Sequence, residues 1–199
     1  ALFLLSGLFS WAFFRSSLDG AANSILGNAN LIKKTYFPRE FLPVCAVMGN
    51  LAGFLFALAV LFVFSLFFGI PLYRGLAWLP LVVFVQVVLT LGIALFLAGM
   101  NTVYRETQFI MDILLLVWFY ATPVVYSLEM AENALPGFVF FFYKLNPMLG
   151  IIRGYQEIFF LGRPPEWGSL AASFVFSGLL FVLGFLSFRS QERVFEDMV

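Results

Sequence analysis

The chain has 199 residues, of which 62% are hydrophobic and only 11% charged, and its acidic and basic side chains balance to a net charge of zero. Soluble domains carry about 25% charged residues, so this composition excludes an ordinary soluble domain. Zero net charge argues against nucleic acid as a partner. The lack of histidine and the single cysteine, Cys45, exclude an intrachain disulfide and a His/Cys metal site.

Two uncharged stretches, 41–73 and 75–104, are longer than the roughly 20 apolar residues that a helix needs to cross the hydrocarbon core of a bilayer. Backbone polar groups must be paired inside lipid, which leaves only helices and closed barrels as spanning structures. Neither stretch alternates with the period of two that barrel strands show. The sequence therefore predicts an all-α protein, a polytopic transmembrane helical bundle that forms a single domain over residues 1–199.

In chain order, residues 1–14 are apolar but too short to cross a membrane unless the helix continues past Arg15 or began upstream. Because the chain opens inside an apolar stretch without Met, we expect a fragment that lacks its N-terminus. Four complete spans are predicted, at about 43–68, 76–100, 109–126 and 167–188. Thr122-Pro123 interrupts the third of these near its end.

The basic residues are divided unevenly between the two sides of these spans. Arg74, Lys144, Arg153 and Arg163 lie on one side, and Arg15, Lys33, Lys34, Arg39, Arg105, Arg189 and Arg193 lie on the other. Cytoplasmic loops carry an excess of Lys and Arg. We therefore expect residues 15–43, the link at Arg105 and the C-terminus to be cytoplasmic, and residues 127–166 to be external.

Residues 28–37 have the pattern of a short cytoplasmic helix. Asn28 or Asn30 can act as its N-cap, a spacing of three and four residues places Ala29, Ile32 and Tyr36 on one face, and the proline at position 38 ends it. Taken alone, the pattern fits either an interfacial anchor held at anionic headgroups or a helix that docks on a partner.

The predicted external region, 127–166, is too long for a turn and too interrupted to span. Residues 137–143 are strongly apolar and should dip into the outer leaflet or pack on neighbouring spans, and residues 148–160 have a helical pattern. Within the latter, Arg153 and Glu157 form an i, i+4 pair worth a few tenths of a kcal/mol. The region is either an aromatic belt at the interface or an outer gate over a translocation path.

Catalysis by this chain is not expected. Asp112 lies one or two turns into the third complete span, where the positive end of the helix dipole stabilises a carboxylate, and no paired charges suggest an ion or proton relay. The sequence has no Gly-x-x-x-x-Gly-Lys-Ser/Thr loop to hold ATP phosphates. A membrane-embedded glycan enzyme would need a reactive carboxylate pair or a histidine, and a structural scaffold would not need a basic helix between spans.

The chain resembles the membrane subunits of type-2 ABC exporters, in the branch that exports bacterial polysaccharides. The resemblance covers essentially the whole chain, and its most specific motif is the Lys-Lys-x-Tyr-Phe-Pro-Arg-Glu run that ends at Glu40. Glu106 departs from the usual aspartate but keeps the charge. The other matching residues are Gly7-Leu8, Trp11, Phe13-Phe14, Asn23 to Asn28, Leu31-Ile32, Leu42-Pro43, Tyr104-Arg105, Thr122-Pro123-Val124, Tyr126, Asn146-Pro147-Met148, Phe188-Arg189, Glu192-Arg193 and Phe195-Glu196-Asp197.

This resemblance implies six spans per subunit, so the first span would be missing here. It implies a pore of two permease copies, two separate ATPase subunits that carry ATP and Mg²⁺, no cofactor on this chain, and a place in the bacterial cytoplasmic (inner) membrane. The cargo would be a lipid-linked polysaccharide, with a drug, a lipid or another small hydrophobic molecule as the alternative.

The resemblance also implies that the segment 28–38 is a coupling helix that docks on the ATPase. The expected coupling residues are Leu31, Ile32, Lys33, Lys34, Tyr36, Phe37 and Arg39. The expected residues of an external gate are Pro123, Tyr126, Asn146, Pro147 and Arg153.

Overall fold

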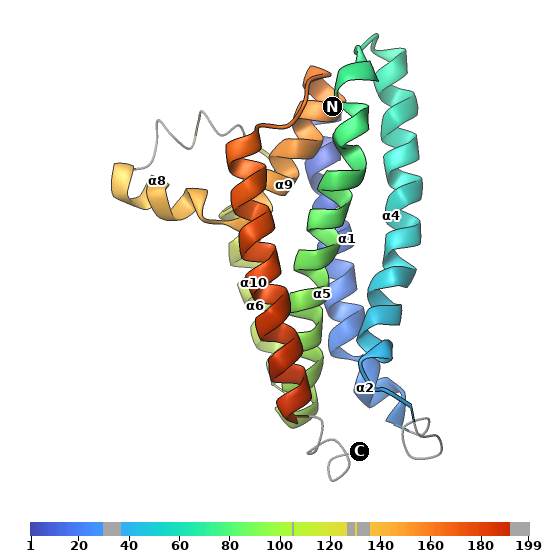
Figure 1. Ribbon diagram of the computed structural model, residues 1–199, viewed down its shortest axis with the longest axis vertical. Coiled ribbons are helices and arrows are strands. Elements are labelled where there is room, and N and C mark those ends of the chain that lie inside the picture. The colour runs from blue at the N-terminus through green and yellow to red at the C-terminus, as the bar shows by residue number, and fades with distance from the viewer. Residues whose placement is uncertain (30–36, 105, 127–129, 131–135, 192–199) are drawn as a thin grey trace.

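The structure is a computed structural model that describes residues 1–29, 37–104, 106–126, 130 and 136–191. Every regular element among these residues is helical, which confirms the predicted all-α fold. Figure 1 shows a bundle of helices that run along one axis: α1 (Leu2–Ala22), α4 (Phe41–Phe67), α5 (Leu79–Val103), α6 (Thr107–Tyr120) and α10 (Trp167–Gln191). We call the end of the bundle that carries α2 (Ser24–Gly27) and the last turn of α10 the lower end, and the other end the upper end.

The first helix, α1 (Leu2–Ala22), continues past Arg15 rather than ending at residue 14. At 1.5 Å per residue, its 21 residues cover about 31 Å, enough to cross the apolar core of a bilayer. The short helix α2 (Ser24–Gly27) follows at the lower end.

Three helical segments among the described residues are long and apolar enough to cross a membrane: Phe41–Phe67, Leu76–Val103 and Trp167–Gln191. They correspond to three of the four complete spans that the sequence predicted. The first is α4 (Phe41–Phe67), the second comprises η2 (Leu76–Trp78) and α5 (Leu79–Val103), and the third is α10 (Trp167–Gln191). A turn through Gly69 and the short η1 (Leu72–Arg74) join the first two at the upper end.

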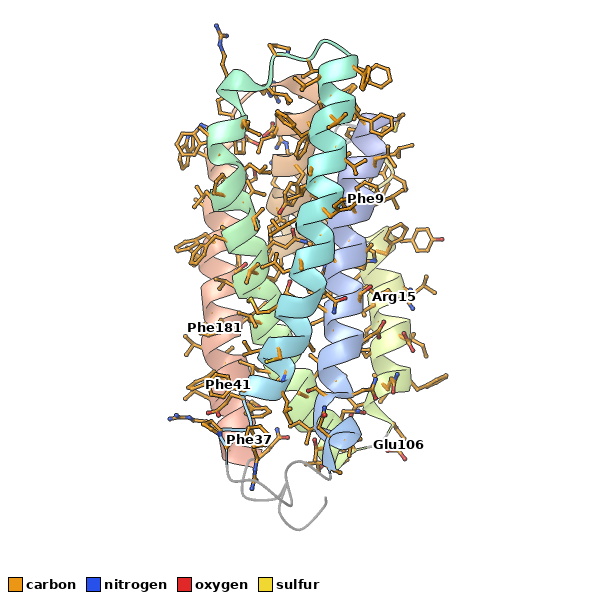
Figure 2. The ribbon with its side chains drawn as sticks, turned by 90° about the vertical axis from the view of Figure 1, so that its right-hand side faces the viewer. Phe9, Arg15, Phe37, Phe41, Glu106 and Phe181 are labelled. Atoms are coloured by element: carbon orange, nitrogen blue, oxygen red, sulfur yellow. The ribbon has the colours of Figure 1, made fainter. Side chains whose placement is uncertain are left out.

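The remaining predicted span, at about 109–126, is shorter than expected. Helix α6 (Thr107–Tyr120) ends at Tyr120 and not at residue 126. The Oγ1 of Thr122 donates to the carbonyl of Trp118 at 2.7 Å, and Pro123 has no N–H with which to continue the helical ladder. In Figure 2, α6 lies beside α1, on the side away from α10.

Residues 137–161 form elements that do not cross the bundle. Helix α8 (Gly137–Lys144) extends sideways in Figure 1, and α9 (Pro147–Gln156) lies inside the upper part of the bundle. The single helix expected over 148–160 is instead α9 followed by the π-helical turn η3 (Glu157–Leu161), which Gly162 ends with φ 62°.

Small residues let two helices approach very closely. A methyl group added at Gly184 of α10 would overlap the carbonyl oxygen of Gly92 on α5. Aromatic rings fill the space between α1 and α4, where Phe13 and Phe54 stack at 4.8 Å between ring centroids. Contacts of both kinds are typical of helix association in membranes, where close packing takes over the role of hydrophobic burial.

Candidate functional site

Of the seven residues expected to couple to an ATPase, five lie outside the described residues: Leu31, Ile32, Lys33, Lys34 and Tyr36. The other two, Phe37 and Arg39, are half-buried and precede α4. Figure 2 places Phe37 at the lower end of the bundle. Nearby, Glu40 approaches Arg189 of α10 with 3.6 Å between Oε1 and Nε, so this segment is joined to the end of the last span.

Asn28 is the C-cap residue of α2, and its side-chain N–H donates to the carbonyl of Ser24 at 2.8 Å. This bond leaves Oδ1, the atom with which an N-cap accepts a backbone N–H, uncommitted, so the expected N-cap role of Asn28 stays a prediction. The predicted helix itself falls largely on residues outside the described part of the chain.

Asn146 is the centre of a polar junction at the upper end of α6. Its Oδ1 accepts from the indole N–H of Trp118 at 2.9 Å and from the backbone N–H of Met148 at 3.0 Å. Its Nδ2 donates to the hydroxyl of Thr122 at 2.9 Å and to the carbonyl of Ala121 at 3.2 Å. One side chain therefore caps α9, just before Pro147 at its first position, and fixes the end of α6.

Pro123 and Tyr126 belong to the same junction. The carbonyl of Pro123 accepts from Nε2 of the buried Gln156 at 3.1 Å. The hydroxyl of Tyr126 donates to the carbonyl of Tyr120 at 2.8 Å and lies 3.3 Å from the hydroxyl of Tyr143 on α8. Burial raises the pKa of Tyr143 above its usual value. Four of the five expected gate residues, Pro123, Tyr126, Asn146 and Pro147, are thus brought together where α6, α8 and α9 meet.

The fifth gate residue, Arg153, lies in a second polar cluster with Glu157, Arg163 and Glu166. The Glu157 side chain is only 4% exposed, and its Oε1 lies 2.8 Å from Nη2 of Arg163 and 3.6 Å from Nε of Arg153. Its Oε2 accepts from the backbone N–H of Glu166 at 2.7 Å, and Arg153 also pairs with the carboxylate of Glu166.

The predicted i, i+4 pair of Arg153 and Glu157 is present. The two residues also belong to a four-residue network that joins η3 to the start of α10, and within it only the Glu157 side chain is buried. An i, i+4 rule sees one partner per residue, whereas Arg163 and Glu166 approach Glu157 because Gly162 reverses the chain.

The partner of Asp112 was not predicted from the sequence. Nη2 of Arg15 on α1 lies 3.2 Å from Oδ1 of Asp112 on α6, and Nε of Arg15 lies 3.9 Å from Oδ2 of Asp19. The expectation that the spans hold no paired charges is wrong for this trio. Arg15 and Asp112 are 97 positions apart, so no local pattern reports their contact.

The bundle and its buried polar junctions define a class of protein, a multi-pass helical membrane protein with polar side chains placed between its spans. No protein-family model matches the chain. Among curated proteins it is 31% identical to the O-antigen export system permease protein RfbA of Myxococcus xanthus over 197 residues, which cover 99% of this chain and 75% of that protein.

Two proteins of the same name from Klebsiella pneumoniae are similar as well. One is 29% identical over 188 residues, 93% of this chain and 67% of its own length, and the other is 30% identical over 162 residues, 81% of this chain and 61% of its own length. The chain belongs to the family of O-antigen export permeases, membrane subunits of type-2 ABC exporters. It is a transport subunit rather than an enzyme and a multi-pass protein of the inner membrane.

Proposed function

We propose that this chain forms the membrane pore of an ABC exporter that moves a lipid-linked cell-surface polysaccharide outward. The observation that carries the proposal is the similarity to permeases named for O-antigen export, which in the Myxococcus xanthus protein extends over 99% of this chain. The same name recurs in both Klebsiella pneumoniae relatives. None of the three is named for a drug or a lipid, so the polysaccharide is favoured over a small hydrophobic cargo.

The energy for transport is proposed to come from a separate ATPase subunit. The sequence has no phosphate-binding loop of the usual kind, so ATP and Mg²⁺ would be held by that partner and no cofactor by this chain. We propose two ATPase subunits, two permease copies and docking through residues 28–38. The position of Phe37 at the lower end, next to the link between Glu40 and Arg189, supports docking at that end.

The junction at Asn146 is proposed to be the external gate. It joins the ends of α6 and α9, and through Tyr126 it reaches α8, so a movement of α6 would be transmitted to both non-spanning helices. The network at Glu157 fixes η3 to the start of α10 and would provide the static side of that gate.

Deletion of the gene, followed by analysis of cell-surface and intracellular glycan, tests the function. We expect the surface polysaccharide to disappear and its lipid-linked form to accumulate inside the cell, and a plasmid copy of the gene to restore display. An ATPase subunit should co-purify with the tagged protein. Unchanged surface polysaccharide in the deletion strain would contradict the proposed cargo.

A further inference from the structure

One arginine of the bundle lies between two carboxylates on different helices. The guanidinium of Arg15 is 3.2 Å from Asp112 on α6 and 3.9 Å from Asp19, one turn further along its own helix, α1. The same cation can therefore be paired either within α1 or across to α6. Since i, i+4 neighbours face each other on a helix, a small rotation of the Arg15 side chain exchanges one partner for the other.

This trio lies at a depth where charged groups are costly in lipid. Arg15 is seven residues before the end of α1 at Ala22, or about 10 Å along the helix axis. Figure 2 shows Arg15 within the length of the bundle, well above Glu106 at the lower end. Charged side chains at membrane depth face a water-filled cavity or a neighbouring chain.

The exposure of the trio shows which way it faces. The side chains of Arg15 and Asp112 are each 46% exposed, and that of Asp19 is 38% exposed. Their formal charges sum to −1, which hydrocarbon would not solvate. The face that α1 and α6 share at this level therefore borders water or the second permease copy, and not hydrocarbon.

Helix α6 is attached to α1 by different interactions in its two halves. In the upper half, the Trp118 ring packs edge-on against Phe14 at 5.4 Å and Trp11 at 6.4 Å, and its indole N–H donates to Asn146. In the lower half, the pair of Arg15 and Asp112 joins the helices. Of the α6 side chains, Met111 and Leu115 are buried. The ion pair and the buried Met111 side chain hold the lower half of α6, so breaking the ion pair removes its one charged link to α1 and lets it pivot about the rings at the other end.

We propose that Arg15 is a positioning residue that sets the place of α6 relative to α1 during transport by changing its partner between Asp112 and Asp19. Paired with Asp112, it holds the lower half of α6 against α1. Paired with Asp19, it stays neutralised within α1 and releases α6, which pivots about the junction at Trp118 and Asn146 while water solvates Asp112. This inference rests on the proposed export function.

Asp19→Asn removes the second partner and leaves the pair of Arg15 and Asp112 intact. Because α6 then loses its released position, we expect an unchanged amount of protein in the membrane and a fall in glycan export of about tenfold, within the range of typical couplings between linked sites. Asp19→Glu keeps the carboxylate and should retain most of the export. Parental export by Asp19→Asn would overturn the proposal.

Exchanging the charges separates a switch from a static clamp. Arg15→Asp combined with Asp112→Arg restores an ion pair between the helices but leaves two carboxylates on α1, at positions 15 and 19. The arginine on α6 is then bound to α1 whichever carboxylate it pairs with. We expect a folded, membrane-inserted protein that exports as poorly as Asp19→Asn, whereas recovered export would identify a static clamp and overturn the switch.

A distance measurement tests the switch without any cargo. Spin labels at Ala12→Cys on α1 and Phe109→Cys on α6, both exposed positions, are introduced in a Cys45→Ser background and diluted with unlabelled chain. We expect two distances in the parental protein turning over ATP, and only the shorter one after Asp19→Asn. Two distances in a protein that exports no polysaccharide would keep the switch and refute the proposed cargo. A distance distribution that Asp19→Asn leaves unchanged would refute the switch, whatever the cargo.

Discussion

Glu157 joins more segments of the chain than any neighbouring charged residue, because its two oxygens bind two arginines and one backbone amide. An acid that is only 4% exposed is tolerated when such partners replace water. The π-helical turn that begins at Glu157 also receives a hydrogen bond from α4, because the hydroxyl of Ser65 donates to the carbonyl of Phe159 at 3.0 Å. The carboxylate therefore stabilises a local conformation that is rare in helices.

We expect Glu157→Gln to destabilise the protein. The amide keeps the shape but has one acceptor oxygen in place of two, so either Arg163 or the backbone N–H of Glu166 loses its acceptor, and a hydrogen bond to a charged group contributes about 1.5–3 kcal/mol. Arg163→Gln is the control, because the Arg163 side chain is 57% exposed and the charge it leaves behind keeps Arg153. Thermal unfolding of the detergent-purified proteins measures both, and equal midpoints for the two variants would refute the central role of Glu157.

At the scale of helices, the contact between α5 and α10 depends on two glycines. Gly92 and Gly184 face each other so closely that a side chain on either one meets the backbone of the opposite helix. Flexible side chains can move aside, but a carbonyl in a helical ladder cannot. The spans α5 and α10 are thus locked at one crossing point.

Gly184→Ala should therefore force the two helices apart. We expect a loss of about 1–3 kcal/mol, the usual cost of an overpacked contact, and a lower yield of monodisperse protein. Gly178 on the same helix has open space beside it, so Gly178→Ala should be neutral or stabilise by up to about 1 kcal/mol through helix propensity. Thermal unfolding of the two variants measures both effects. A Gly184→Ala protein as stable as the parent would show that the contact between α5 and α10 is not tight.

The part of the fold that could be predicted from the sequence is the set of long spans, because their stretches carry no charge. The spans α4, α5 and α10 were predictable because a charge-free stretch of their length has few other structures in lipid. The end of α6 was missed because the hydroxyl of Thr122 turns back onto the carbonyl of Trp118, a bond that apolar composition does not report. The candidate site was predictable only where residues are close in sequence, as at Asn146-Pro147. The partner of Asp112 lies 97 positions away, and tertiary packing alone decides that distance.

On the scale of the whole molecule, the loops between the spans lie alternately at the two ends of the bundle, as the count of basic residues on each side assumed. The start of α4, the link before α6 and the last turn of α10 lie at the lower end, whereas the connection from α4 to α5 and the start of α10 lie at the upper end. Arg39, Glu106 and Arg189 therefore belong to one side of the membrane, and Arg74 and Arg163 to the other. The basic excess in the sequence predicts that the lower end is cytoplasmic.

Cysteine labelling in spheroplasts decides this orientation. Ala77→Cys at the upper end and Ser190→Cys at the lower end are conservative changes at exposed positions, made in a Cys45→Ser background. An impermeant maleimide should label the first variant in intact spheroplasts and the second only after permeabilisation, since the bilayer separates the two ends. Both should be labelled equally in detergent, which controls for reactivity. Labelling of Ser190→Cys but not Ala77→Cys in intact spheroplasts would invert the molecule, place residues 28–38 outside the cell and remove the route by which an ATPase could drive it.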